Sequence, residues 1–182
     1  MSPLVSGYVL TDQAYVARLV ERNLEENANA TAQQKSSTQK RKGKSPSSTA
    51  KPVNIRFTPL DWELDEVTES LTGSPDMGSF DAVIACDCVY NEALIKPLVQ
   101  TCADACRLRQ RETGRNDGGA ATPAICIVAQ QLRDPEVFEG WIKEFSSQFR
   151  AWRVPEKALS KELRENTGFV VHIGILKDSG AP

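Results

Sequence analysis

Short apolar runs alternate along this chain with longer stretches in which apolar residues recur every three or four positions. The short runs have the length and alternation of strands, and the longer stretches have the periodicity of helices with one apolar face. The predicted strands are residues 7–11, 53–57, 80–86, 124–130, 151–154 and 169–176. The predicted helices are residues 13–27, 94–109 and 135–149.

This order of elements favours an open α/β sheet with mostly parallel strands, closed by a terminal strand pair. The third helix has the clearest start, because Asp134 is a good N-cap residue and Pro135 suits the first helical position. Its apolar positions are expected to form the core. They are Phe138, Trp141, Ile142, Phe145 and Phe149.

Two stretches interrupt the pattern. Residues 28–52 contain no aliphatic residue larger than Ala and no aromatic residue or Cys, which predicts a disordered insert because little apolar surface can be buried there. Residues 113–123 contain three glycines and are expected to form a flexible loop. The length of 182 residues suits a single domain, residues 1–182, around these two stretches.

The charge is divided unevenly. The chain has a net charge of −2, but residues 28–60 hold seven bases and no acids, which leaves the remaining residues at −9. A basic cluster at residues 40–44 could contact RNA, the ribosome or a nuclear import receptor through charge alone. The insert has no aromatic residues for base stacking, and a solvated linker is the alternative interpretation.

Composition argues against export and membrane insertion. The longest apolar run, residues 124–129, is too short to span a bilayer, and residues 1–4 lack a secretory pattern. Five cysteines without an export signal are expected to be reduced thiols. The sequence therefore predicts a soluble, cytoplasmic protein with no membrane contact, and the basic cluster leaves nuclear access open.

Metal and histidine chemistry have weaker support in the sequence. Cys86, Cys88, Cys102 and Cys106 could be imagined as zinc ligands, but their placement on a strand and a helix favours small buried side chains, so no metal is expected. His172 is the only histidine, and its place in the last predicted strand favours a packed residue over a catalytic base.

Acidic residues follow the first three predicted strands, where ligands bind in open α/β sheets. Asp12 follows the first, Asp61-Trp62-Glu63 the second and Asp87-Cys88-Val89-Tyr90 the third. A carboxylate can accept both ribose hydroxyls, and an acid beside an aromatic ring can bind adenine, which together indicate a nucleoside pocket. The structural alternatives are helix caps or turns for Asp12 and Asp87, and a lid over the core for Trp62.

These residues, in this order, resemble the METTL21-like seven-strand S-adenosylmethionine-dependent protein-lysine methyltransferases, above all the fungal ribosomal lysine N-methyltransferases. The resemblance rests on residues 8–13, 60–63 and 85–91. It implies a Rossmann-like fold, S-adenosylmethionine as cofactor and a lysine of a protein, such as a ribosomal protein, as methyl acceptor. It also implies that Asp12, Asp61, Trp62 and Cys86 bind the cofactor, while Asp87 and Tyr90, as an Asp-x-x-Tyr signature, border the reacting groups.

One feature of that family is missing. The family's first strand ends in a glycine-rich turn beneath the cofactor, whereas none of the eleven glycines here forms a Gly-x-Gly-x-x-Gly pattern. We therefore expect a methyltransferase fold without its first strand, either because Met1 is an internal start or because the chain is a degraded, inactive relative that serves as an interaction module. A nicotinamide-dependent reductase would need the same glycine loop and leaves the Asp-x-x-Tyr segment unexplained.

Overall fold

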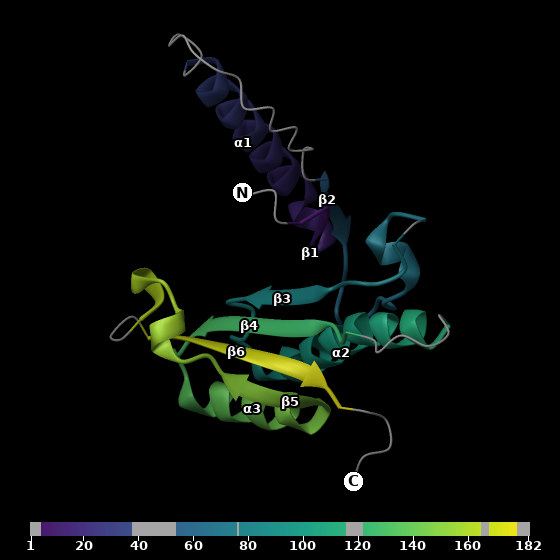
Figure 1. Cartoon of the computed structure of the whole chain (residues 1–182). Helices are drawn as coiled ribbons and strands as arrows, with labels where there is room; N and C mark the ends of the chain where they lie inside the picture. The colour runs from purple at the N-terminus through teal and green to yellow at the C-terminus, as the bar shows by residue number, and fades with distance from the viewer. Residues whose placement is uncertain (1–4, 38–53, 76, 116–121, 165–167, 178–182) are drawn as a thin grey trace. The chain divides into compact units, whose positions relative to one another are not determined.

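The computed structural model describes residues 5–37, 54–75, 77–115, 122–164 and 168–177 (Figure 1). Its contacts divide the chain into two compact units, Met1–Asp61 and Trp62–Pro182, which we call the N-terminal and the C-terminal unit. Helices and strands form the mixed α/β architecture that the sequence predicts. The single-domain interpretation stays a prediction.

The N-terminal unit is built on two parallel strands. Strand β1 (Gly7–Asp12) pairs with β2 (Asn54–Pro59), and Leu10 lies opposite Phe57. Parallel neighbours need a long crossover, and a 3-10 turn (Ala14–Val16) and helix α1 (Ala17–Ser37) belong to it. The backbone N–H of Leu60 donates to the carbonyl of Asp12 at 3.0 Å, so the carboxyl ends of both strands lie side by side.

Helix α1 is longer than the apolar periodicity indicates. It continues to Ser37, so the prediction of disorder is wrong for residues 28–37. These residues include three alanines, two glutamines and a lysine, all good helix formers, which extend a helix already nucleated by the residues before them. The rest of the predicted insert, including the basic cluster at residues 40–44, lies outside the described residues.

The C-terminal unit contains a mixed four-stranded sheet (Figure 1). Its strands are β3 (Ala82–Cys86), β4 (Ile125–Gln131), β5 (Phe149–Arg153) and β6 (Phe169–Leu176). The order is β3-β4-β6-β5, in which β3 and β4 are parallel while β6 runs antiparallel to both of its neighbours. The expected pairing of the two terminal strands is confirmed. Three of the four strands, β3, β4 and β5, therefore run in the same direction, as the prediction of mostly parallel strands requires, and only β6, which inserts between β4 and β5, is reversed.

Two long helices accompany this sheet. They are α2 (Glu92–Arg115) and α3 (Pro135–Gln148), and three 3-10 turns lie at Glu69–Thr72, Glu156–Ala158 and Lys161–Leu163. The predicted cap of α3 is confirmed, since the Asp134 carboxylate accepts the backbone N–H groups of Glu136 at 2.8 Å and Val137 at 3.3 Å. Helix α2 includes residues 113–115, so the loop prediction is wrong there. The glycine at 114 falls in the last turn, where helices tolerate it, and residues 116–121 lie outside the described residues.

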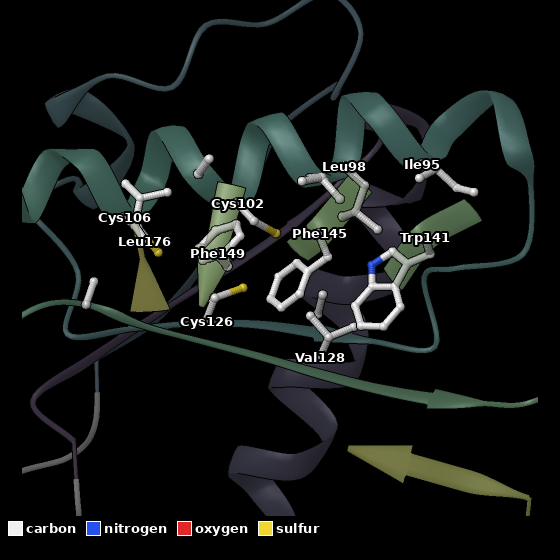
Figure 2. Packing of buried hydrophobic residues seen from close by; sticks show 14 of the residues in the cluster. Ile95, Leu98, Cys102, Cys106, Cys126, Val128, Trp141, Phe145, Phe149 and Leu176 are labelled. Carbon is white, nitrogen blue, oxygen red and sulfur yellow. The ribbon is translucent and has the colours of Figure 1, made fainter. Parts of the chain in front are cut away.

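The core of the C-terminal unit lies between these helices and the sheet (Figure 2). The Trp141 ring lies 5.0 Å from that of Phe145, which stacks on Phe149 at 4.5 Å. These three side chains are fully buried, as predicted, although Phe149 begins β5 rather than ending α3. Phe138 and Ile142 are only half-buried against the cluster. The α2 stripe supplies the opposite wall, namely Ile95, Leu98, Val99, Cys102 and Cys106.

Candidate functional site

Asp87 directly follows β3 and is fixed by three contacts. Its backbone N–H donates to the carbonyl of Ala129 at 2.7 Å, which extends the pairing of β3 with β4 by one residue. Its carboxylate pairs with the Arg133 guanidinium at 2.6 Å and accepts the backbone N–H of Gln131 at 3.4 Å. Its φ of +54° is in the left-handed region, which Asp tolerates better than most residues. The carboxylate is therefore held at the carboxyl ends of two parallel strands.

Tyr90, the last residue of the Asp-x-x-Tyr segment, is 64% exposed and lines a small cavity. The cavity has a volume of about 100 Å³. Its walls come from the segment after β3, from the end of β4 and from the first turns of α3. They are Val89, Tyr90, Gln130, Gln131, Leu132, Arg133, Asp134, Val137 and Phe138. Arg133 thus connects Asp87 to the cavity that Tyr90 borders.

The cap interpretation of Asp87 is wrong. Asn91, not Asp87, accepts a backbone N–H at the start of α2, from Ala93 at 3.0 Å. The Asp87 carboxylate is instead engaged by Arg133 and the backbone of Gln131. Gln130 ends the fourth predicted strand and Arg133 follows it, and nothing in the sequence assigns either residue a chemical role. Only the carboxyl end of this strand, where ligands bind in open α/β sheets, pointed to the region.

Asp12 and Asp61 are linked through Gln13 in the N-terminal unit. The Asp12 carboxylate accepts the backbone N–H of Gln13 at 2.7 Å, and the Gln13 side-chain amide donates to the Asp61 carboxylate at 3.0 Å. Gln13 itself, rather than Asp12, precedes the 3-10 turn, and it makes no side-chain cap bond. An exposed carboxylate beside a strand end fits a ligand that offers two hydroxyl donors, as a ribose does.

Trp62 and Cys86 belong to the C-terminal unit. Trp62 is half-buried and packs against the hydrophobic core, which agrees with the alternative interpretation of this ring as a lid. Cys86 is an exposed free cysteine whose backbone carbonyl accepts the Cys88 thiol at 3.3 Å. The expectation that Cys86 is buried is therefore wrong. Side chains alternate between the two faces of a strand, so Cys86 points away from the face on which its neighbour Ala85 is buried.

The remaining thiols are packing residues. Cys102, Cys106 and Cys126 are buried, and burial raises the pKa of Cys106 to about 12. A hydrogen bond with Cys102, together with burial, raises the pKa of the Cys126 thiol well above its ordinary value. Zinc binds thiolates, so protonated thiols are poor ligands. Among the residues that the structure describes, no group of three or more His, Cys, Asp or Glu side chains could hold a metal ion.

His172 is buried in the core rather than presented to the cavity of Tyr90. Its ring lies 5.2 Å from Trp141 and 5.9 Å from Phe138. Burial, with a smaller contribution from Arg153, lowers the pKa of His172. The prediction of a packed histidine is confirmed.

No helix in the described ranges is long and apolar enough to cross a membrane.

Comparison with known proteins gives a family. A family model described as lysine methyltransferase matches residues 6–111, more than half of the chain. The matched region begins at β1, includes Asp12, Asp61, Trp62, Cys86, Asp87 and Tyr90, and ends within α2. No curated protein matches the chain. The match over this length, together with the mixed α/β fold, shows that the chain belongs to the lysine methyltransferase family.

Proposed function

We propose that this chain transfers a methyl group from S-adenosylmethionine to a lysine side chain of another protein. The observation that carries the proposal is the position of Asp87, fixed at the carboxyl ends of β3 and β4 next to the cavity lined by Tyr90. A methyl donor follows from the family, and S-adenosylmethionine is the donor that we propose.

When bound, S-adenosylmethionine supplies an electrophilic methyl on a sulfonium, which passes to the lysine nitrogen as the carbon–sulfur bond breaks. We infer that the Asp12 carboxylate accepts the ribose hydroxyls and that Asp61 binds the adenine amino group. Trp62 and Cys86 complete the proposed cofactor contacts. These four residues bind and orient, and the reaction needs neither a metal nor a covalent nucleophile from the chain.

On the acceptor side, Asp87 attracts the lysine ammonium and Tyr90 forms one wall of its channel, since an aromatic face favours cations. Arg133 now neutralises part of the Asp87 charge at 2.6 Å, so an incoming ammonium competes with the guanidinium for this carboxylate. Val89, Val137 and Phe138 form the apolar part of the cavity wall, which limits the hydration of a bound amine and favours its neutral, reactive form after it loses its proton.

The finer assignment extends this proposal. We propose membership of the METTL21-like group, a ribosomal protein as the acceptor and a cytoplasmic location with access to the nucleus. The basic residues of 28–60 against a net charge of −9 elsewhere support a weak contact with ribosomal RNA through the insert.

The test is methyl transfer from tritiated S-adenosylmethionine to purified ribosomal subunits. We expect Asp87→Asn to lower kcat/KM at least tenfold, because the carboxylate charge is lost while the shape stays. Tyr90→Ala should lower it as well, whereas Tyr90→Phe keeps the aromatic wall and most activity. Glu139→Gln, the corresponding acid-to-amide change on the exposed side of α3, is the matched control. Unchanged transfer by Asp87→Asn and Tyr90→Ala would reject the assignment.

A second candidate is an inactive relative that serves as an interaction module, which the missing Gly-x-Gly-x-x-Gly pattern favours. Thermal unfolding with and without excess S-adenosylmethionine separates the two, because a ligand that binds only the folded state raises the midpoint. An upward shift supports the enzyme. A midpoint that does not move supports the interaction module.

A further inference from the structure

Gln130 is a buried polar side chain whose presence the core does not explain. It lies near the end of β4, is 2% exposed and lines the cavity bordered by Tyr90. Its side-chain nitrogen Nε2 is buried and has no hydrogen-bond partner among the described residues. An unsatisfied buried donor destabilises the folded state, so a residue selected only for packing would be apolar here.

The surroundings of Gln130 offer no substitute for that partner. In the pairing of β4 with β6, Gln130 lies opposite Val170, two residues from the pair of Val128 with His172. The same sheet face thus presents Val128, a core residue, and His172, whose Nδ1 is also buried and unpartnered. Phe138, which packs on His172, is a wall of the cavity. The amide is therefore the buried donor of a cavity with mainly apolar walls.

An amide N–H requires a hydrogen-bond acceptor, and this requirement narrows the ligand. The lysine ammonium has only donors, and the neutral amine that reacts needs its single lone pair for the methyl group, so neither form satisfies Nε2 during transfer. A polypeptide acceptor carries carbonyl oxygens close to its lysine, in the backbone and in neighbouring amide side chains. A volume of about 100 Å³ accommodates one such group beside Tyr90.

We propose that Gln130 donates a hydrogen bond to a carbonyl oxygen of the acceptor polypeptide, next to the lysine that is methylated. This role rests on the proposed function and makes Gln130 a specificity-determining residue. A site built to hydrogen-bond a ligand group disfavours ligands that lack it, because the buried donor is then left without a partner. The residue lies outside the region matched by the family model.

Two substitutions separate a binding role from a structural one. Gln130→Met keeps the length without the donor, and Gln130→Glu keeps the shape but replaces the donor with an acceptor. We expect both to raise the KM for the acceptor protein roughly three- to tenfold, which corresponds to one hydrogen bond, with unchanged kcat and unchanged S-adenosylmethionine affinity. Gln130→Met should also raise Tm by a few degrees, because it removes an unsatisfied donor. Gln100→Met, on the exposed side of α2, is the control for a partnered glutamine: it should leave the acceptor KM unchanged and lower Tm slightly, because the side-chain hydrogen bonds with Asp104 and Gln148 are lost.

Direct binding is measured on the ¹⁵N-labelled full chain through the side-chain amide resonances of Gln130. The probes are pentylamine, which has no carbonyl, Nα-acetyl-lysine N-methylamide, which has backbone carbonyls, and the same compound extended by Asn. We expect the carbonyl-bearing probes to shift the Gln130 amide and pentylamine to leave it unchanged. A shift with the Asn probe alone assigns the bond to a neighbouring side chain rather than to the backbone.

Three outcomes overturn the proposal. The first is a lower Tm for Gln130→Met together with an unchanged acceptor KM, because this result indicates that the amide permanently holds a water molecule. An improved KM for Gln130→Glu would indicate that the residue accepts from the ammonium. A probe that shifts the amide resonances of Asp87 and Tyr90 but not those of Gln130 is compatible with the proposed function and rejects this inference. If a carbonyl probe shifts Gln130 while no acceptor is methylated, the binding site stands and the proposed function fails.

Discussion

The two units of this chain position their strand-end acids by different physical means. In the C-terminal unit, Asp87 follows a strand that packs on a continuous core of aromatic and aliphatic side chains. In the N-terminal unit, Asp12 and Asp61 are connected through the hydrogen bonds of Gln13 at the end of a two-stranded sheet. Among the described residues, every buried apolar side chain except Leu60 belongs to the C-terminal unit.

This difference matters because buried apolar area contributes most of the free energy of folding, about 25 cal/mol per Å², while a single hydrogen bond adds only about 1 kcal/mol net. Two-stranded sheets are marginal by themselves. Asp87 and Tyr90, which we propose to contact the acceptor lysine, therefore lie in a well-packed unit. Asp12 and Asp61, which we propose to bind the ribose and the adenine, lie in a thinly packed one. Substitutions in the two units should differ accordingly in their effect on the free energy of unfolding.

The largest expected effect is that of Trp141→Ala. Trp141 is fully buried and stacks on Phe145, so its removal leaves a large cavity and should cost about 3–5 kcal/mol of unfolding free energy. Urea denaturation followed by far-ultraviolet circular dichroism measures this loss. Trp152→Ala, at a tryptophan that is 52% exposed in β5, is the matched control and should cost less than about 1 kcal/mol. Equal losses would contradict the assignment of the core.

The next effect is that of Gly174→Ala in β6. An added Cβ would lie 2.5 Å from Cζ of Phe145 and 3.1 Å from Cβ of Phe149, closer than the two stacked rings allow without moving. We expect a loss of about 1–3 kcal/mol from this overpacking. Gly140→Ala in α3 is the opposite case, because its Cβ would meet only Ile95 at 3.4 Å and alanine favours the helix by about 1 kcal/mol. Destabilisation by Gly140→Ala, or none by Gly174→Ala, would refute this packing.

The sequence predicts elements whose signals are local. The apolar stripe of α2 and the Asp134-Pro135 start of α3 depend on neighbouring residues, and the structure confirms both. The place of β6 between β4 and β5 depends on contacts between residues far apart in the chain, which no periodicity records. Helix α1 extends beyond residue 27 because residues with high helix propensity continue after the last residue of its apolar face.

The candidate site shows the same division. Asp12 and Asp87 could be singled out because an acid after a strand occupies the edge where ligands bind. Arg133 and Gln130 could not be assigned a role, since the ion pair of Arg133 with Asp87 and the missing partner of Gln130 are properties of folded side chains. Whether Trp62 and Cys86 bind the cofactor stays a prediction.

A smaller effect is the pH dependence caused by His172, the only histidine. Burial lowers its pKa in the folded state, so below pH 6.5 the unfolded chain binds a proton that the folded chain does not. Stability should therefore be complete above pH 6.5 and fall as the pH drops from 6.5 toward the folded pKa, by at most about 1.4 kcal/mol per pH unit. Urea denaturation at pH 7.0 and 5.5 measures the slope, and His172→Gln should remove it. A slope that persists in His172→Gln would assign it to other groups.

The smallest effect is expected in the N-terminal unit, for Leu19→Ala in α1. The sequence places Leu19 on the apolar face of this helix, but the side chain is 54% exposed, so truncation removes little buried area and leaves no cavity. Alanine also favours the helix slightly. We expect a change within about 0.5 kcal/mol, against a loss of about 2–5 kcal/mol for Leu98→Ala in α2, where the leucine is buried. Hydrogen exchange of the α1 and α2 amides measures both changes locally. A large loss for Leu19→Ala would show that α1 buries this face against a partner, and the contrast between a packed and a thinly packed unit would then no longer hold.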